Sequence, residues 1–202
     1  MIVIIDYGVG NLFSLASSLS YFGLESCVSS DKTVIANARK LILPGVGAFY
    51  DAAKLLADSG LDITVKNEVK KGKPLLGVCL GMQLLFERGL EYGDHAGLGL
   101  LKGIVSPLAP DIPNNLKIPQ MGWNSLNIKA DSPILKYMHE GEYFYFVHSY
   151  YAKGCADSLL ASTEYGTNVP AIVGRDNIYG CQFHPEKSGR AGLNILKAFS
   201  EI

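Results

Sequence analysis

Three short apolar runs recur in the first half of the chain, and each ends in a glycine-rich polar segment. The runs are IVIID at residues 2–6, KLILPG at residues 40–45 and PLLGV at residues 74–78. A run of this length without polar alternation is typical of a parallel strand that is buried on both faces. Helical patterns fill the gaps, over residues 12–22 and 50–71. Strands that alternate with helices favour an open, mostly parallel sheet, in which sites form at the carboxyl ends of the strands.

The second half of the chain has a different pattern. After a further helix, predicted to open at residues 82–86, several segments alternate apolar and polar residues, and an RDN turn at residues 175–177 predicts a hairpin. A last helix is expected after Ser188, its predicted N-cap. The predicted fold class is therefore α/β, with an open, mostly parallel central sheet, flanking helices and an antiparallel β extension. No repeat or linker divides the chain, so we expect a single domain over residues 1–202.

The composition excludes several classes of function. The chain has 18 basic and 19 acidic residues and a formal net charge of −1, so neither nucleic acid nor an anionic membrane surface is an expected partner. No apolar stretch approaches the ~18 residues of a membrane span, and no basic segment precedes the first apolar run. The four cysteines are scattered without a C-x-x-C spacing, which favours reduced thiols in the cytoplasm. We expect no metal site and no other cofactor.

One cysteine has an unusual sequence context. Residues 77–81, Gly-Val-Cys-Leu-Gly, have the G-x-nucleophile-x-G form of a nucleophile elbow, a sharp turn from a strand into a helix. Glycines on both sides let the two backbones approach without Cβ clashes, and the N-terminus of the helix favours a thiolate. The amide that follows the nucleophile, here that of Leu80, can contribute to an oxyanion hole. A small cysteine buried in an ordinary turn has the same local pattern, so Cys79 alone does not decide the function.

A base for this cysteine is available in FHPEKS, after the last predicted strand. His184 can take up the thiol proton at neutral pH, and Glu186 can orient the imidazole and stabilise its charged form. Because residues i and i+2 of a strand share a face, Glu186 is expected to reach a ring nitrogen of His184. An exposed or capping histidine is the alternative. Cys27, Cys155 and Cys181 lack such a context and are predicted to serve in packing.

Taken together, these motifs resemble those of the class I, triad-type glutamine amidotransferases. The resemblance covers nearly the whole chain and includes LILPGVGAF, PLLGVCLGMQLLFE, IPQMGWN, YFYFVHSYY and CQFHPEKSG. It implies a flavodoxin-like sheet, with Cys79 as the nucleophile, His184 as the acid–base and Glu186 as its orienting partner. The implied reaction converts L-glutamine and water to glutamate and ammonia, through a glutamyl thioester on Cys79.

The resemblance also implies roles for residues around this triad. The amides of Val46 and Leu80 would form the oxyanion hole, and the Val46 peptide would reorient to do so, which its flanking glycines permit. The positions that match the family's site for the amino-acid end of glutamine are Gly47, Gln83, Glu91, His148 and Ser149. We expect Glu91 on a helix, where a solvated carboxylate is the alternative.

Within the family, the motifs PGVGAF, PQMGWN and FVHSY are most similar to those of the glutaminase subunits of L-histidine biosynthesis. Such a subunit forms a heterodimer with a (β/α)₈-barrel cyclase, which receives the ammonia through a protected channel. The positions implied at or near this contact are Trp123, Asn124, Tyr145 and Lys187. Trp123 is expected to be exposed in a polar loop, and a core tryptophan is the alternative.

Three other hypotheses remain open. Nothing in the pattern names the ammonia acceptor, so the same glutaminase chemistry could serve another synthase, such as one that amidates a sugar. A thiol peptidase or hydrolase on a related sheet would share the cysteine elbow. A non-catalytic module would descend from an amidotransferase, although the intact Cys79, His184 and Glu186 argue against it.

Overall fold

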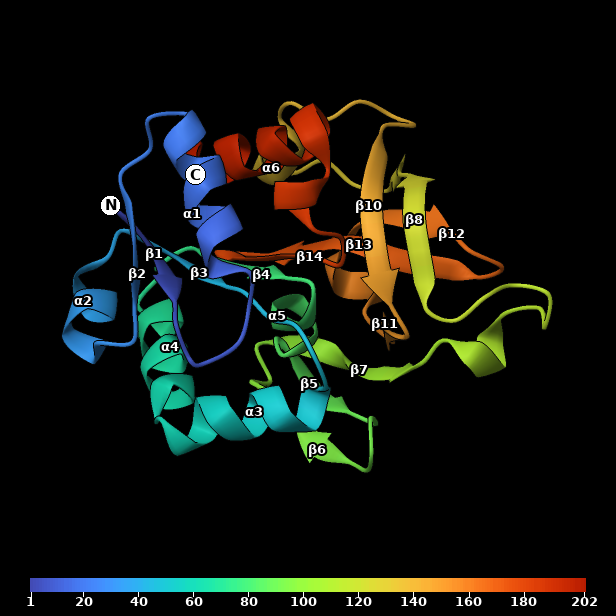
Figure 1. Ribbon diagram of the computed structural model, residues 1–202, viewed down its shortest axis with the longest axis horizontal. Coiled ribbons are helices and arrows are strands. Elements are labelled where there is room, and N and C mark those ends of the chain that lie inside the picture. The colour runs from blue at the N-terminus through green and yellow to red at the C-terminus, as the bar shows by residue number, and fades with distance from the viewer.

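An eight-stranded sheet forms the centre of the computed structural model, which describes residues 1–202 (Figure 1). Its strands, in spatial order, are β2 (Ser26–Ser29), β1 (Ile2–Ile5), β3 (Lys40–Leu43), β4 (Leu75–Val78), β14 (Ile178–Cys181), β13 (Asn168–Arg175), β12 (Leu159–Glu164) and β9 (Asn127–Ile128). The pairs from β2 to β14 are parallel, and those from β14 to β9 are antiparallel. The predicted fold class, a mostly parallel sheet with an antiparallel extension, is confirmed.

Helices cover both faces of the parallel part of the sheet (Figure 1). One face carries α1 (Leu12–Tyr21) and α6 (Gly189–Glu201). The other carries α2 (Lys32–Asn37), α3 (Phe49–Asp58), α4 (Leu61–Lys70) and the single turn α5 (Leu80–Gln83). None of these helices combines the length and the apolar character that a membrane span requires.

The apolar runs of the sequence are divided between two cores. Ile2 and Ile4 of β1 belong to the core under α1 and α6, whereas Val3 and Ile5 belong to the core under α3 and α4. Successive side chains of a strand point to opposite faces of its sheet. A strand between two layers of helices therefore needs an apolar residue at every position, which explains the uninterrupted runs.

Two smaller sheets lie beside the antiparallel end of the central sheet (Figure 1). One is the two-stranded ribbon of β8 (Gln120–Ser125) and β10 (Tyr143–His148). The other has the order β11 (Tyr150–Lys153), β7 (Leu101–Pro107), β5 (Phe86–Gly89) and β6 (His95–Ala96). The inner face of β10 packs Phe144 and Phe146 on Phe183, with ring centroids 4.3 and 5.7 Å apart, which fixes the ribbon to the segment after β14.

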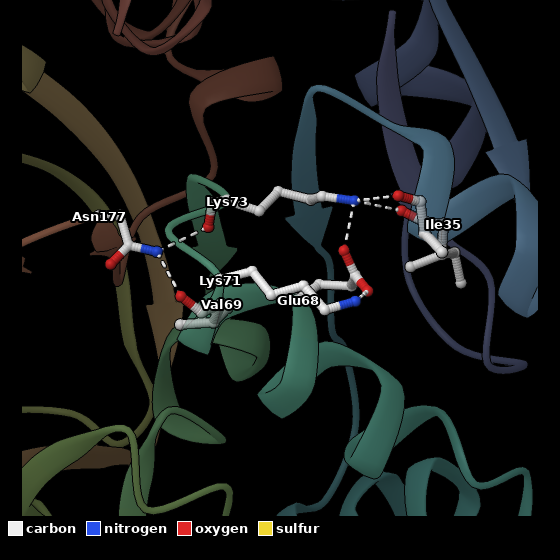
Figure 2. A network of polar contacts seen from close by, with 7 residues as sticks. Ile35, Glu68, Val69, Lys71, Lys73 and Asn177 are labelled. Atoms are coloured by element: carbon white, nitrogen blue, oxygen red, sulfur yellow. Dashed lines mark hydrogen bonds and ion pairs between the residues drawn. The ribbon is translucent and has the colours of Figure 1, made fainter.

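Lys73 joins three elements at the entrance to β4 (Figure 2). Its Nζ donates to the carbonyl oxygens of Ile35 and Ala36, in the last turn of α2, at 2.9 and 2.7 Å. The same Nζ lies 2.8 Å from the carboxylate of Glu68 on α4, which also pairs with the exposed Lys71 at 2.6 Å. A helix as short as α2 has little stability of its own, so these bonds to carbonyl groups of its last turn help to keep it folded.

The β13–β14 hairpin is tied to the same corner (Figure 2). Asn177, in the two-residue turn of the hairpin, donates from Nδ2 to the carbonyl oxygens of Val69 and Lys73, at 2.9 and 2.8 Å. The predicted RDN hairpin is therefore present, and its turn holds the end of α4 and the start of β4 against β14.

Two local helix predictions are wrong. Residues 82–86 do not form a helix, because α5 ends at Gln83 and the next carbonyl groups accept from residues 98–101 instead. All seven residues from Leu80 to Phe86 are buried, so the pattern of burial there has no period that would separate a helix from a strand. The helix predicted over residues 50–71 is two helices, α3 and α4, separated by Gly60 with a φ of 66°.

Candidate active site

Cys79 lies at the corner between β4 and α5 in a strained backbone conformation. Its φ of 54° and ψ of −113° fall outside the regions that L-residues favour. The backbone on both sides is fixed, because the Cys79 N–H donates to the Cys181 carbonyl at 2.8 Å and the Cys79 carbonyl accepts from Gln83 at 3.2 Å. Strain that is held in this way is frequent at functional sites.

The glycines of the elbow are there to provide space. A Cβ on Gly81 would lie 1.9 Å from the carbonyl oxygen of Leu43, and one on Gly77 would lie 2.7 Å from the carbonyl oxygen of Gly81. A Cβ on Gly45 would meet the Gly81 nitrogen at 2.6 Å. The three glycines therefore permit the close approach of β3, β4 and α5 that the sequence predicts for a nucleophile elbow.

A pocket of about 330 Å³ opens at this corner. Its lining residues are Val46, Gly47, Cys79, Leu80, Gln83, Glu91, Pro119, Val147, His148, Ser149, Tyr150 and His184. The structure thus gathers the predicted nucleophile, its base, both oxyanion residues and all five glutamine-site residues around one cavity. Pro119, Val147 and Tyr150 were not predicted, although each adjoins a motif that was: Pro119 begins PQMGWN, and the other two flank the His-Ser of FVHSYY.

His184 and Glu186 are in contact behind this pocket. The Nδ1 of His184 lies 2.9 Å from Oε1 of Glu186, and both side chains are buried. Asn11 donates to the same oxygen at 3.4 Å, while Oε2 of Glu186 has no partner. The predicted contact is present, but the geometric reason given for it is wrong. β14 ends at Cys181, and a 3₁₀ turn over Pro185–Lys187, not a strand, brings the carboxylate back to the imidazole.

The charge of His184 depends on its two partners. Burial by itself lowers the pKa of this imidazole, but hydrogen bonding to Cys79 and to Glu186 outweighs it and holds the pKa well above the ordinary value of 6.5. The ring is therefore kept in its protonated form between a sulfur and a carboxylate. Such a ring can give a proton to a leaving group and then act as a base.

Ser188 does not cap α6 with its side chain, contrary to the prediction. Its hydroxyl donates to the carbonyl oxygen of His184 at 2.7 Å and accepts from the N–H of Tyr145 at 2.9 Å. The N–H of His184 in turn donates to the carbonyl of Tyr145 at 3.1 Å. These bonds join β10 to the turn that carries the imidazole, and no local sequence pattern indicates them.

Gln83 and Glu91 are oriented by bonds to the backbone and to a neighbouring side chain. The Gln83 Nε2 donates to the carbonyl of Tyr150 at 2.9 Å and to Oε1 of Gln182 at 3.0 Å. Glu91 lies in a turn after β5 and not on a helix as expected; its carboxylate accepts from the N–H of Phe49, the first residue of α3, at 2.7 Å. Glu91 therefore combines a place in the pocket with a capping role.

His148 differs from His184 in its state of charge. Its Nδ1 donates to the carbonyl of Tyr150 at 2.9 Å, so that its Nε2 is the unprotonated nitrogen, and this Nε2 is buried without a partner. Burial lowers the pKa of His148, the bond to Tyr150 opposes this, and the nearby His184 adds to the lowering, with a net pKa of about 4. Within one pocket, one imidazole is kept protonated and the other neutral.

Val46 lies in the segment that joins β3 to α3. Its side chain is exposed, and Gly47 beside it has a φ of 92° with free space where a Cβ would be. Gly47 is therefore needed for its positive φ, whereas Gly45, on the other side of Val46, is needed because there is no space for a Cβ. The direction that the Val46 N–H would take with glutamine bound stays a prediction.

The residues predicted at a partner contact gather near the β8–β10 ribbon. Trp123 lies in strand β8 and not in a loop as expected, and it is 53% exposed, which agrees with the exposed tryptophan that was predicted. It is paired across the ribbon with Tyr145, at 6.1 Å between ring centroids, and Lys187 is exposed at the end of the 3₁₀ turn over Pro185–Lys187. Asn124 faces the other way, where its Oδ1 accepts from Gln120.

The outer face of this ribbon is more apolar than the sequence motifs indicated. Met121 and Tyr143 are 62% and 60% exposed, and the strand register places both on the side of Trp123. Their exposure could not be read from the sequence, because the alternation in each strand leaves open which face is covered.

Comparisons with known proteins agree with this geometry. The family model described as glutamine amidotransferase class-I matches residues 3–201. A protein named imidazole glycerol phosphate synthase subunit HisH, from Caldanaerobacter subterraneus subsp. tengcongensis, is 52% identical over 203 residues, which cover 100% of this chain and 98% of that protein. A protein of the same name from Listeria monocytogenes is 50% identical over 202 residues, covering 100% of this chain and 96% of its own length.

Solved structures share the fold at lower identity. A crystal structure of a glutamine amidotransferase aligns over 99% of this chain and 100% of its own, with a TM-score of 0.76 and 20% identity. The structure of PurLQS from Thermotoga maritima aligns over 99% of this chain and 97% of its own, with a TM-score of 0.77 and 19% identity. At these identities the likeness concerns the fold alone.

Proposed function

The chain belongs to the class I glutamine amidotransferase family, and we propose that it is the glutaminase subunit of an imidazole glycerol phosphate synthase in L-histidine biosynthesis. The observation that carries the proposal is the pocket in which Cys79, at a strained elbow, faces His184 with Glu186 behind it. Full-length relatives that are 50–52% identical and bear the name of that subunit support the choice of synthase.

The proposed reaction proceeds through a thioester. The Cys79 sulfur attacks the carboxamide carbon of glutamine, and the amides of Val46 and Leu80 receive the oxyanion. His184, which is protonated before the attack, gives its proton to the departing nitrogen, and ammonia leaves. The neutral His184 then takes a proton from the water that attacks the thioester, so glutamate is released and the Cys79 thiolate is restored beside a protonated His184. Glu186 keeps the imidazole in the required orientation throughout.

The amino-acid end of glutamine is proposed to lie on the other side of the pocket. Both hydrogens of the Gln83 amide are taken by acceptors, so its oxygen is the atom left for the substrate. This oxygen and the carboxylate of Glu91 suit the α-ammonium group. Gly47, His148 and Ser149 complete the wall that faces the α-carboxylate.

The ammonia acceptor is proposed to be a (β/α)₈-barrel cyclase that forms a heterodimer with this chain and makes imidazole glycerol phosphate and an aminoimidazole carboxamide ribonucleotide. The contact would use the exposed face of the β8–β10 ribbon with Trp123 and Tyr145, together with Asn124 and Lys187. Ammonia that escaped into water would become ammonium and lose its nucleophilicity, so the cyclase must cover the pocket. We further propose that the pair acts in the cytoplasm, where the four unpaired cysteines would stay reduced.

Replacement of the proposed nucleophile tests this function. In the complex with the cyclase, Cys79→Ala should lower glutamine-dependent synthesis by about three orders of magnitude, while synthesis from added ammonium salts survives. Cys27→Ala, which removes a half-buried thiol in β2, is the matched control and should leave both activities intact. Persistence of glutamine-dependent activity in Cys79→Ala would refute the proposed chemistry. Capture of a sugar-amidating synthase from cell extract, in place of the cyclase, would refute the proposed acceptor.

The isolated chain should be a poor glutaminase. Because the Val46 peptide must reorient to complete the oxyanion hole, and the glycines beside it permit two orientations, the partner is expected to favour the productive one. Glutamine hydrolysis should therefore rise when the cyclase and its ligand are added. A fully active isolated chain that does not respond to them would contradict this part of the proposal.

A further inference from the structure

Gln182 is a fully buried glutamine that touches two of the proposed active-site residues. It follows β14 directly, and its backbone N–H donates to the carbonyl of Ala171 at 2.9 Å, so its position continues the β13–β14 ladder. A polar amide is removed from water only at a cost, unless its hydrogen-bonding groups have partners. The partners of Gln182 are the substrate-site residue Gln83 and the sulfur of Cys79.

The bonds of Gln83 determine which way the Gln182 amide points. The Gln83 nitrogen has two hydrogens; one goes to the carbonyl of Tyr150 and the other to Gln182. Since an amide nitrogen can only donate, the atom of Gln182 that faces it must be the oxygen, Oε1. The Gln182 nitrogen then faces Cys79, with Nε2 3.9 Å from Sγ.

We propose that Gln182 is a positioning residue for the glutaminase reaction, acting on the substrate through Gln83 and on the nucleophile through its own amide dipole. The inference deepens the proposed function and rests on it. By accepting from Gln83, Gln182 keeps the Gln83 oxygen directed toward the pocket, where it can receive the α-ammonium of glutamine. By donating toward Sγ, it places the positive end of a dipole beside the sulfur in a site of low dielectric, which favours the negative thiolate.

The two actions can be separated by substitution. Gln182→Met fills a similar volume and removes both the acceptor for Gln83 and the donor for Cys79. One hydrogen of Gln83 then lacks an acceptor, and its amide is free to turn an N–H toward the substrate ammonium. Gln182→Glu keeps an acceptor for Gln83 but replaces the donor by a carboxyl group that becomes negative when it ionises. Thr163→Val is the matched control, since it removes a buried side-chain bond, 2.8 Å from Oγ1 to the Ser125 carbonyl, on β12.

The experiment measures two quantities on each variant. The first is KM and kcat for glutamine in the complex with the cyclase; the second is the rate at which iodoacetamide alkylates Cys79 in the full chain, followed by mass spectrometry from about pH 6 to about pH 9. Gln182→Met should raise KM about tenfold and slow alkylation about threefold. Gln182→Glu should leave KM within about twofold of wild type, while its alkylation rate relative to wild type falls as pH rises and the carboxyl ionises.

The outcomes decide between positioning and mere packing. The proposal is overturned if Gln182→Met leaves both KM and alkylation within about twofold of wild type. It is also overturned if Thr163→Val, compared at equal thermal stability, produces the same changes. If the wild-type complex does not turn over glutamine, the proposed function fails and the KM effect fails with it. The alkylation profile of Gln182→Glu still tests the contact with Cys79 in that case, and a flat ratio across the pH range overturns it.

Discussion

At Cys79 the fold sustains a backbone conformation that costs about 1–3 kcal/mol. Fixed neighbours hold this strained conformation, since the strand before Cys79 is bonded to β14 and Gly81 after it allows α5 to pack closely against β3. The pKa values of the two imidazoles in the pocket are shifted in opposite directions. Bonding to Cys79 and Glu186 keeps His184 charged, and burial keeps His148 neutral. Environments that separate the pKa values of neighbouring groups are typical of acid–base sites.

His148 should make folding sensitive to mild acid. The unfolded imidazole takes up a proton below about pH 6.5, whereas burial holds the folded pKa at about 4, so each pH unit in this window costs about 1.4 kcal/mol of stability. The raised pKa of His184 acts in the opposite sense: its contribution is fully present below about pH 6.5 and is lost as pH rises through the folded value. Between about pH 6.5 and pH 5, therefore, only His148 of these two histidines changes the free energy of unfolding, which falls by about 2 kcal/mol.

Urea unfolding at about pH 7 and about pH 5 measures this loss. His148→Gln, which cannot take up the proton in either state, should lose about 2 kcal/mol less than wild type over that interval. The carboxylates whose pKa values are lowered, such as Glu68 and Asp111, lose their contribution only at lower pH and affect both proteins equally. Identical losses in the two proteins would assign the acid sensitivity to other groups.

How much of the site could be predicted depended on the distance between its parts along the chain. The elbow around Cys79 is local, so its glycines indicate it directly. The contact of His184 with Glu186 was predicted because the two residues are close in sequence, although a 3₁₀ turn makes it. Gln182 and Gln83 are separated by 99 residues, and no local pattern announces such a bond.

At the scale of elements, the end of α2 and the entrance to β4 depend on one buried lysine. Lys73 has 10% of its side chain exposed and bonds to two carbonyl groups of α2, while Glu68, 7% exposed, balances its charge. Lys71 pairs with the same carboxylate but has 68% of its side chain exposed. Buried pairs are costly to break because one charge is left without a partner, and exposed pairs contribute little.

Replacing each lysine by methionine tests this difference. Lys73→Met should destabilise the protein by about 3 kcal/mol, because it removes the partner of Oε2 in the buried Glu68 carboxylate and the lysine donor to two carbonyl groups of α2. Lys71→Met, the matched control, should cost less than about 1 kcal/mol. Urea unfolding gives both values. An equal loss of unfolding free energy in the two variants would show that the buried pair stabilises the protein no more than the exposed one.

Element types were predictable where burial leaves a pattern. The runs at residues 2–6 and 40–45 became β1 and β3 because strands covered on both faces are apolar throughout. The helix predicted after Cys79 is wrong for the same reason: every residue from 80 to 86 is buried, so no pattern marks the end of α5 after one turn. The pairing of Leu84 and Leu85 with residues 98–101 decides that segment, and it lies outside any local window.

At the scale of the whole molecule, the exposed apolar residues of the β8–β10 ribbon lie on the side of the proposed pocket. Val147 and His148 at the end of β10 line the cavity, and Trp123 and Tyr145 stand farther along the same ribbon. A partner seated on this face would therefore be next to the released ammonia. If the proposed partner binds this face, its recognition and the closure of the pocket would be linked.

Trp123→Ala should weaken binding of the cyclase about thirtyfold, as expected for a central aromatic anchor. Ile63→Ala, at a 61% exposed position on α4, on the opposite face of the sheet from α1 and α6, is the control and should leave affinity unchanged. Isothermal titration calorimetry gives both affinities, and Cys79 alkylation verifies that the pocket is intact in each variant. Unaltered affinity in Trp123→Ala would move the proposed contact away from the ribbon.

The position of β14 has a consequence for the newly made protein. This strand is inserted between β4 and β13, with Ile178 opposite Leu75, and the segment with His184 and Glu186 follows it in the sequence, before α6. A ribosome thus synthesises Cys79, the proposed nucleophile, long before it synthesises His184, the proposed acid–base. Under the proposed mechanism, a copy whose translation stops before His184 would have the cysteine but no proton donor for the departing nitrogen, and so a prematurely terminated product would not hydrolyse glutamine.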